Sequence, residues 1–466
     1  MIAKITFLGA TGTVTGSKYL LETNGKKLLV DCGLFQGLKE LRLRNWDNFP
    51  VSPAGIDAVI LTHAHIDHCG YLPRLTRQGF RGPVYCTHAT RAFCDLLLRD
   101  SAHLQEEDAR WANKKGFSKH KPALPLYTQQ DVETCLKQFI PCHYGEDIVP
   151  EEGLRIKFRD AGHILGSAFA DIKITRGETT RKILFSGDIG SPNRPILHDP
   201  VQVYEVDYLI VESTYGDRLH GDSQKAREQD LARVINDNCK RGGILIIPAF
   251  AVGRTQELLY HIRELENQGS IPPLPVFIDS PMAINATAIT AQMQNDYDLQ
   301  ARMLVIDGQE ILKTANLHIA KSVEESKALH AVRGPAIFIS ASGMLEGGRV
   351  LHHLQERLPK EENTVLFVGY QAEGTRGRAL QNGNAEIKIH GSMVPVKAHV
   401  ESISGFSGHA DYREILAWLM GFNRPPRQTF IVHGEPVSSQ AMSDRIKQHL
   451  GWPVHIPVLG QSFVLN

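Results

Sequence analysis

Four potential metal ligands occur within six consecutive residues, in the run His63-Ala64-His65-Ile66-Asp67-His68. The run directly follows the apolar segment 58–61, which we expect to form a strand. A loop that leaves a strand changes side-chain direction every residue or two. His63 and His65 can therefore reach one ion while Asp67 and His68 turn toward a second. A polar turn with hydrogen-bonded histidines would rarely combine these residue types, so the run predicts a metal site.

Other apolar segments also end close to a residue that can bind a metal. Asp31 follows 27–30, His163 follows 155–158, Asp188 follows 182–186, Glu212 follows 209–211 and His433 follows 430–432. One such coincidence means little, but its recurrence at strand ends is what a site on one edge of a sheet requires. We therefore expect these residues to gather beside the run at 63–68.

A glycine-rich segment near the start offers an alternative that the sequence disfavours. Gly9-Ala10-Thr11-Gly12 follows a strand-like segment at 2–8 and resembles a dinucleotide-binding loop. Such a loop must open into a helix whose N-terminus holds the phosphates. Here two strand-like segments follow instead, joined by Asn24-Gly25, a dipeptide that favours a type I′ hairpin turn. The pattern predicts a turn and a hairpin.

The pattern of predicted secondary structure is different between about 209 and 395. Short β-branched segments at 244–248, 276–279, 336–340 and 364–369 alternate with helical patterns at 255–268, 283–294 and 348–358. Strands that alternate with helices of this length indicate a mostly parallel, doubly wound α/β sheet. With 466 residues in total, we expect two domains.

The composition limits the classes of function. Lys plus Arg and Asp plus Glu both number 51, so the chain has no strongly basic coat for nucleic acid and no acidic tail. None of the seven cysteines forms a C-x-x-C pair, which disfavours a disulfide scaffold or a thiolate zinc site. No apolar segment approaches the roughly 20 residues that span a bilayer. We expect a soluble, cytoplasmic protein with no membrane partner.

Taken together, these motifs resemble the metallo-β-lactamase superfamily and, within it, the β-CASP nucleases. The resemblance covers nearly the whole chain. It rests on Asp31, the run at 63–68, His163, Asp188, Glu212 in V-E-S-T-Y-G, His409 in F-S-G-H-A-D and His433 in V-H-G-E. It implies an αββα sandwich built from 1–208 and 396–466, with 209–395 inserted as a β-CASP cap domain.

The resemblance also implies a set of metal ligands. His63, His65 and His163 would hold one zinc ion, Asp67, His68 and His433 would hold the other, and Asp188 would bridge them. Asp31 would orient a ligand by accepting its outer N–H. Ligands of nitrogen and oxygen fit zinc, and manganese stays open as an alternative.

Two such ions suit the hydrolysis of a phosphodiester by a metal-bridging hydroxide. The resemblance assigns catalytic roles to Asp67, Asp188, Glu212 and His409, with His409 as the general acid and Glu212 as its partner. His433 favours RNA over DNA, because the DNA-repair branch of the family tends to lack it. We therefore expect a zinc-dependent ribonuclease acting on single-stranded RNA and leaving 5′-phosphate and 3′-hydroxyl ends. The lack of further domains favours an endonuclease over an exonuclease.

The cap offers candidates for binding RNA phosphate. Ser342 and Gly343 follow a predicted strand and open toward a helix, where backbone N–H groups can face an anion. Arg376 and Arg378 lie in a glycine-rich loop, and Tyr370 offers a stacking face. Solvated loop arginines are the alternative interpretation. Arg254, in the family motif P-A-F-x-x-G-R, could bind phosphate or form a structural ion pair.

Three alternatives stay open. The chain could be a non-catalytic RNA-binding subunit of a processing complex, or a metallohydrolase acting on DNA, or one acting on a small ester. A homodimer is also compatible with the sequence.

Overall fold

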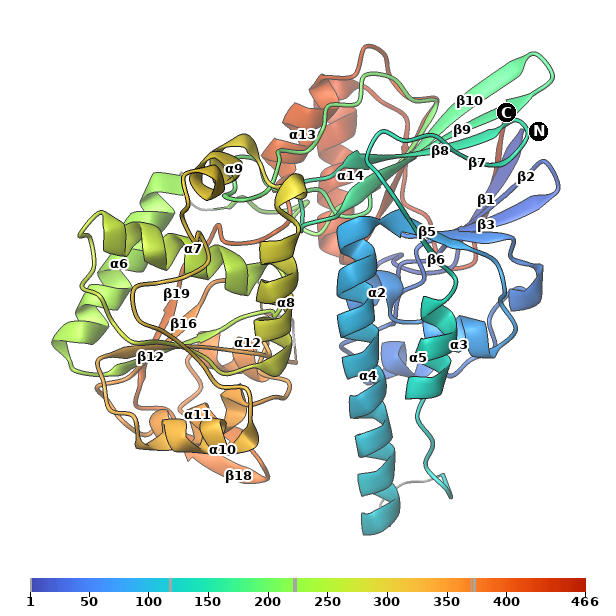
Figure 1. Ribbon diagram of the computed structural model, residues 1–466. Helices are drawn as coiled ribbons and strands as arrows, with labels where there is room; N and C mark the ends of the chain where they lie inside the picture. The colour runs from blue at the N-terminus through green and yellow to red at the C-terminus, as the bar shows by residue number, and fades with distance from the viewer. Residues whose placement is uncertain (1, 117–119, 221–223, 370, 372–373) are drawn as a thin grey trace. The chain divides into compact units, whose positions relative to one another are not determined.

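The computed structural model describes residues 2–116, 120–220, 224–369, 371 and 374–466, with the side chains of Gln224 and Lys225 left out (Figure 1). The chain forms two compact units. The first comprises Met1–Pro192, His198–Leu219 and His409–Asn466, and the second comprises Asn193–Leu197 and His220–Gly408.

The first unit is a sandwich of two mixed sheets, each with seven strands among the described residues. In spatial order, one sheet contains β22 (Ser462–Leu465), β1 (Ala3–Phe7), β2 (Tyr19–Thr23), β3 (Lys26–Val30), β4 (Ala58–Ile60), β5 (Val84–Thr87) and β6 (Phe139–Cys142). The other contains β21 (Val454–His455), β20 (Gln428–Val432), β11 (Tyr208–Glu212), β10 (Thr179–Phe185), β9 (Ala168–Arg176), β8 (Leu154–Asp160) and β7 (Ile148–Glu151).

Alternation along the strands separates the two faces of the second sheet. Tyr208 and Ile210 of β11 face the other sheet, whereas Leu209 and Val211 face helices α13 (Tyr412–Met420) and α14 (Pro436–Leu450). The first sheet is covered by helices that include α4 (His88–Lys115), which packs on β5 and β6 (Figure 1). The remaining helical elements of this unit are α1 (Lys39–Arg44), η1 (Pro53–Gly55), α2 (Ile66–Cys69), α3 (Leu72–Arg77) and α5 (Gln129–Leu136). The αββα sandwich expected from the resemblance is confirmed.

The predicted hairpin near the N-terminus is also present. Strands β2 and β3 pair antiparallel, and Asn24 and Gly25 between them have φ angles of 49° and 77°. Both central residues of a type I′ turn need positive φ, which asparagine and glycine tolerate. The glycine-rich segment after β1 leads into β2 and not into a helix, so a dinucleotide loop is excluded.

The second unit is built on a parallel sheet with six strands among the described residues. In spatial order these are β14 (Leu317–Ile319), β13 (Val276–Ile278), β15 (Ala336–Ser340), β12 (Ile244–Pro248), β16 (Thr364–Phe367) and β19 (His399–Ser402). The helical elements are α6 (Gln224–Lys240), α7 (Arg254–Asn267), α8 (Pro281–Gln292), η2 (Gln294–Asp296), α9 (Leu299–Ile306), α10 (Val323–Ala328), η3 (Leu329–Ala331), α11 (Val350–Arg357) and α12 (Arg376–Gln381). A separate hairpin joins β17 (Glu386–Ile389) and β18 (Ser392–Pro395).

Both faces of this sheet are buried. Leu245 and Ile247 of β12 pack on one side in a cluster that includes residues of α6 and α7, and Ile244 and Ile246 pack on the other side in a cluster that includes residues of α11. A parallel sheet covered on both faces produces the continuous apolar strands seen in the sequence. The doubly wound α/β cap is confirmed.

The two units meet at 219/220 and 408/409, whereas the sequence predicted boundaries at 208/209 and 395/396. β11 pairs with β10 and β20 of the first unit, and β19 pairs with β16 of the second. A short apolar segment does not specify which sheet it joins, since that depends on partners distant in sequence. Within the described part of the chain, no helix combines the length and apolar character needed to cross a membrane.

Candidate metal centre

The side chains predicted to bind metal meet at one edge of the sandwich. β3 and β4 run parallel, and so do β10, β11 and β20, so within each set the strands have their carboxyl ends on the same edge. Asp31, His63, Asp188, Glu212 and His433 follow or end these five strands. His163 lies in the loop between β8 and β9. The structure therefore brings these side chains together, and their role as metal ligands stays a prediction.

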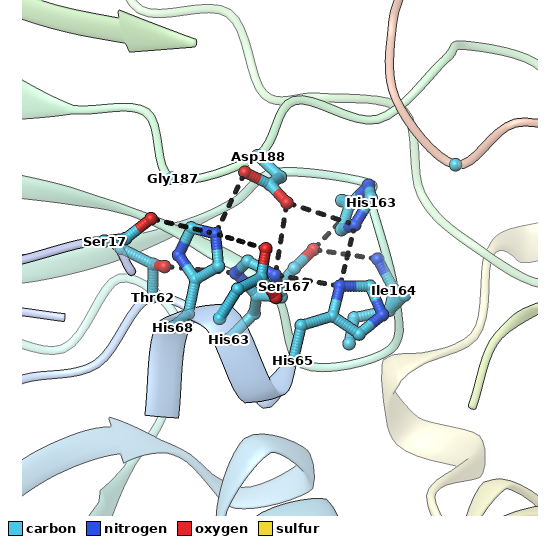
Figure 2. Close-up of polar contacts among 12 residues, drawn as sticks. Ser17, Thr62, His63, His65, His68, His163, Ile164, Ser167, Gly187 and Asp188 are labelled. Carbon is cyan, nitrogen blue, oxygen red and sulfur yellow. Dashed lines mark hydrogen bonds and ion pairs between the residues drawn. The ribbon is translucent and has the colours of Figure 1, made fainter. Parts of the chain in front are cut away.

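One group contains His63, His65, His163 and Asp188, whose ligand atoms all lie within 4.8 Å of one another. Nε2 of His63 lies 3.3 Å from Oδ2 of Asp188 and 3.1 Å from Nδ1 of His65. Nε2 of His163 lies 3.5 Å from the same Asp188 oxygen and 3.3 Å from Nδ1 of His65 (Figure 2). Three imidazole nitrogens and one carboxylate oxygen that converge in this way can hold one metal ion.

A second group contains Asp67, His68 and His433. Nε2 of His68 lies 3.1 Å from Nε2 of His433, and the latter atom lies 3.4 Å from Oδ2 of Asp67. His433 has a φ of 50°, a strained value for a residue other than glycine, and its N–H donates to the carbonyl oxygen of Ala10 at 2.8 Å. The hydrogen bond to Ala10 helps to hold the backbone of His433 in this uncommon conformation.

Asp188 lies between the two groups. Its Oδ2 faces His63 and His163, while its Oδ1 lies 3.3 Å from Nε2 of His68 (Figure 2). The same Oδ1 lies 3.5 Å from Nδ1 of His433. Oδ1 is buried and accepts no hydrogen bond among the described residues. A buried carboxylate oxygen with histidine nitrogens around it and no hydrogen bond fits a metal-bridging ligand.

Asp31 is hydrogen-bonded to His68, as its predicted orienting role requires. Its Oδ2 accepts the N–H at Nδ1 of His68 at 2.8 Å, which turns Nε2 of His68 toward the second group. Asp31 also accepts the backbone N–H of Thr62 at 2.8 Å and its hydroxyl at 2.9 Å. Thr62 therefore fixes the carboxylate that fixes the ligand.

Burial lowers the pKa of several of these histidines. Burial and the nearby charge of His68 lower the pKa of His63 to about 3, and burial lowers the pKa of His65 to about 4. Neutral imidazoles present the lone pair that a metal needs. Burial opposes the charge on Asp188, but His433 and His68 outweigh it and hold the pKa of Asp188 well below its usual value.

Glu212 and His409 form a pair beside the first group. Nδ1 of His409 lies 3.1 Å from both carboxylate oxygens of Glu212, and 3.9 Å from Oδ2 of Asp188. Burial disfavours the imidazolium, but the carboxylates of Glu212 and Asp188 outweigh it and raise the pKa of His409 to about 9. His409 is therefore protonated near neutral pH, which is the state a general acid needs.

The structure adds neighbours that the sequence did not single out. The hydroxyl of Thr214 lies 3.1 Å from Nδ1 of His433, and the Tyr215 ring stacks near His409 with centroids 6.2 Å apart. Both residues belong to the V-E-S-T-Y-G motif that contains Glu212, so their place in this motif could have indicated that they lie near the site. Ser17, with its hydroxyl 3.4 Å from Nε2 of His68, lies in no motif that points to metal.

The predicted phosphate-binding residues of the cap lie within the second unit and are largely engaged in holding its loops. The Ser342 hydroxyl accepts the N–H of Glu346 at 3.0 Å. Arg376 donates to the carbonyl oxygens of Lys388 and Leu345 at 2.8 and 3.1 Å. Gly343 packs against Phe250, and Arg378 is half-buried on α12. Tyr370 lies outside the described residues, and the phosphate-binding role of this set stays a prediction.

Arg254 takes part in a buried ion-pair cluster of the second unit. Nη1 of Arg254 lies 2.9 Å from Oε2 of Glu257, and Nη2 of Arg194 lies 2.8 Å from the same oxygen. Burial favours the neutral acid, but the two guanidinium groups outweigh it and lower the pKa of Glu257 to about 2. Arg254 therefore forms a structural ion pair, which was the alternative to phosphate binding.

Two groups of histidine and aspartate that share one carboxylate, at the edge of an αββα sandwich, define a metal-dependent hydrolase. Family models match the chain in three segments. Residues 11–236 match the metallo-beta-lactamase superfamily, 255–380 match the Beta-Casp domain, and 393–457 match the Zn-dependent metallo-hydrolase RNA specificity domain.

Similar proteins agree with these matches. Ribonuclease TTHA0252 of Thermus thermophilus is 37% identical over 432 residues, which cover 93% of each chain. Transcription termination factor FttA of Methanocaldococcus jannaschii is 34% identical over 98% of this chain and 70% of the relative. A crystal structure of a protein of unknown function from Enterococcus faecalis matches over 100% of both chains, with a TM-score of 0.57 and 13% identity, and supports the fold alone. The chain belongs to the β-CASP ribonuclease family of the metallo-β-lactamase superfamily.

Proposed function

We propose that the protein is a zinc-dependent endoribonuclease that cleaves single-stranded RNA and leaves 5′-phosphate and 3′-hydroxyl ends. The observation that carries this proposal is the position of Asp188, with one carboxylate oxygen toward each of two histidine groups. The likeness to a protein named as a ribonuclease, and the match to an RNA specificity domain, support RNA as the substrate.

The ligand assignment follows the two groups. We assign His63, His65 and His163 to one ion, Asp67, His68 and His433 to the other, and Asp188 to both. When bound, two such ions supply a water of lowered pKa and stabilise the charge on the phosphodiester oxygens. Donors of nitrogen and oxygen without thiolate fit zinc and also manganese.

Around these ligands, the protein's own groups orient and transfer protons. Asp31 and Thr62 fix the ring of His68, so that its Nε2 faces the second group. Glu212 accepts the N–H of Ile189 at 2.6 Å and holds Nδ1 of His409. The protonated His409 carries its other proton at Nε2, and we assign that proton to the departing 3′ oxygen.

The compartment and the partners follow from the same observations. All seven cysteines are free thiols, six of them buried, which supports a reducing, cytoplasmic setting. We propose single-stranded RNA as the partner. A homodimer is a further possibility that size measurements in solution can test.

The test uses the zinc-loaded protein with linear and circular single-stranded RNA, compared with the Asp67→Ala variant. We expect the wild-type protein to cut both RNAs and Asp67→Ala to cut neither. Cleavage of the circle identifies an endonuclease, because an exonuclease needs an end. Ligation assays on the products then identify the 5′-phosphate and 3′-hydroxyl.

The same preparation separates the alternatives. Less than one zinc ion per chain would favour a non-catalytic RNA-binding subunit. Equal cleavage of single-stranded DNA of the same sequence would change the substrate class to nucleic acid in general. Turnover of a lactone, thioester or β-lactam with RNA left intact would replace the ribonuclease with a small-ester hydrolase.

A further inference from the structure

Lys18 is a buried lysine immediately before β2, with only 4% of its surface exposed. An ammonium group taken out of water is costly unless polar or aromatic partners replace the solvent. Nothing in the sequence pattern around Lys18 predicts this burial. The partners of its side chain therefore indicate what the residue does.

The ammonium is held by backbone oxygens and two aromatic rings. Nζ donates to the carbonyl oxygen of Gly33 and lies 3.4 Å from that of Gly16. It also lies 4.5 Å from the ring centroid of Phe35 and 4.9 Å from that of Tyr71. Carbonyl oxygens and ring faces both attract a cation, so the cage replaces the lost hydration.

Gly33 connects this cage to two of the metal ligands. A Cβ atom at Gly33 would lie 1.6 Å from the carbonyl oxygen of Asp67 and 2.6 Å from the backbone nitrogen of His68. The backbone at Gly33 therefore packs directly on the peptide that joins Asp67 to His68. A displacement of Gly33 would displace that peptide.

Backbone hydrogen bonds join the same three segments. Ser17, next to Lys18, donates its N–H to the carbonyl oxygen of Asp67 at 2.9 Å, and Gly33 donates to that of Ser17 at 3.0 Å. Cys32 donates to the carbonyl oxygen of His68 at 2.7 Å, and Tyr71 donates to that of Cys32 at 2.8 Å. The segments 16–18, 31–35 and 66–71 thus form one unit, and the Lys18 ammonium contacts two residues of 31–35, one of 66–71 and the backbone of its own segment.

We propose that Lys18 is a positioning residue of the metal centre, and that it holds the Gly33 carbonyl and the Tyr71 ring so that Asp67 and His68 keep their places for the second ion. The inference rests on the ligand assignment of the proposed function. A methionine at this position would fill a similar volume, but it would leave the Gly33 carbonyl without its donor. Loss of the ammonium should loosen the segment that supports Asp67 and His68 and leave His63 and His163 in place.

The experiment measures zinc binding to the full-length apo protein by competition with a chelating dye, without RNA. We expect Lys18→Met to bind the first zinc ion as the wild type does and the second about 10–100-fold more weakly, the usual cost of losing a group that positions a ligand. With Co²⁺ as the probe, the visible absorption of the second ion should change and that of the first should not. Lys27→Met is the matched control, because the Lys27 side chain is 42% exposed and pairs with Glu22 on the surface.

Variants at Tyr71 test the same cage if Lys18→Met does not fold. Tyr71→Leu removes the ring face and should weaken the second ion about 10-fold, whereas Tyr71→Phe keeps the ring and should bind as the wild type does. If Lys18→Met and Tyr71→Leu each bind the first and the second zinc ion as tightly as the wild type does, the inference is overturned and the ligand assignment stays intact. A wild-type protein that binds only one ion would overturn the assignment itself.

Discussion

Nδ1 of His409 is 3.1 Å from each carboxylate oxygen of Glu212, and the Glu212 side chain is fully buried. Glu212 also accepts the N–H of Ile189, the residue after Asp188. The pair is therefore fixed to the loop that carries the shared carboxylate. The pair therefore lies beside the proposed metal ligands, where His409 could act as the proton donor that we propose.

Substitution of His409 should remove proton donation and leave metal binding unchanged. We expect His409→Ala to lower kcat for RNA cleavage by about 10²–10⁴-fold, the usual contribution of a general acid. Glu212→Gln should lower kcat less, because the ring stays oriented by a neutral partner. The measurement is single-turnover cleavage together with the zinc content of each variant. His399→Ala, at an exposed position on β19, is the control; a fall in zinc content would instead make His409 a ligand.

Asp31 should act through His68. In Asp31→Asn, the Thr62 contacts can persist, but the charge that fixes the His68 ring is lost. We expect affinity for one of two zinc ions to fall about 10–100-fold. Asp57→Asn serves as control, because Asp57 accepts the N–H of Lys27 at 2.8 Å on the surface. Equal zinc affinity in the two variants would contradict the role of Asp31.

Gly33→Ala should destabilise the protein far more than Gly55→Ala does. The new Cβ would overlap the Asp67 carbonyl, so the backbone must move, at a cost of about 3 kcal/mol or more. Gly55→Ala meets no atom within 4 Å and should change stability by less than about 1 kcal/mol. Urea unfolding followed by tryptophan fluorescence measures both, since all four tryptophans lie in the first unit. Similar midpoints for the two variants would show that the loop at 33 tolerates a side chain.

The Glu257 cluster should make the second unit sensitive to acid. Because its pKa falls to about 2 on folding, the carboxylate contributes stability that is complete above its unfolded pKa and is lost as pH falls toward 2. The shift corresponds to about 3 kcal/mol at neutral pH. Glu257→Gln should therefore destabilise the second unit by about that amount at neutral pH and by progressively less below about pH 4.

Hydrogen exchange of the amides in α7 measures this loss of stability. The tryptophan fluorescence of the first unit should be the same in wild type and in Glu257→Gln at each pH. If the difference in the free energy of unfolding between wild type and Glu257→Gln is constant across the pH range, the charge on Glu257 is not the source of the difference.

The meeting of these side chains at one edge of the sandwich could be predicted from the sequence, because Asp31, Asp188, Glu212 and His433 follow or end short apolar strands and because His63 to His68 form a linear run. Their roles as metal ligands stay a prediction. The hairpin turn at Asn24-Gly25 and the alternating cap were predictable for the same local reasons. Lys18 was not, because lysine is normally a surface residue and its burial depends on Phe35 and Tyr71, which reach it only in the folded chain. The membership of β11 and β19 in their sheets likewise depends on distant partners.

The order of the chain has a consequence for when activity can arise during synthesis. His63, His65, His163 and Asp188 leave the ribosome before the cap, whereas His409 and His433 follow it. Strand β1 acquires its outer neighbour β22 only with residues 462–465. A nascent chain can therefore complete the first ligand group and the cap while it still lacks the second group and the proton donor. We expect hydrolysis to begin only after the motif that contains His433 has been translated and has joined the residues that precede the cap.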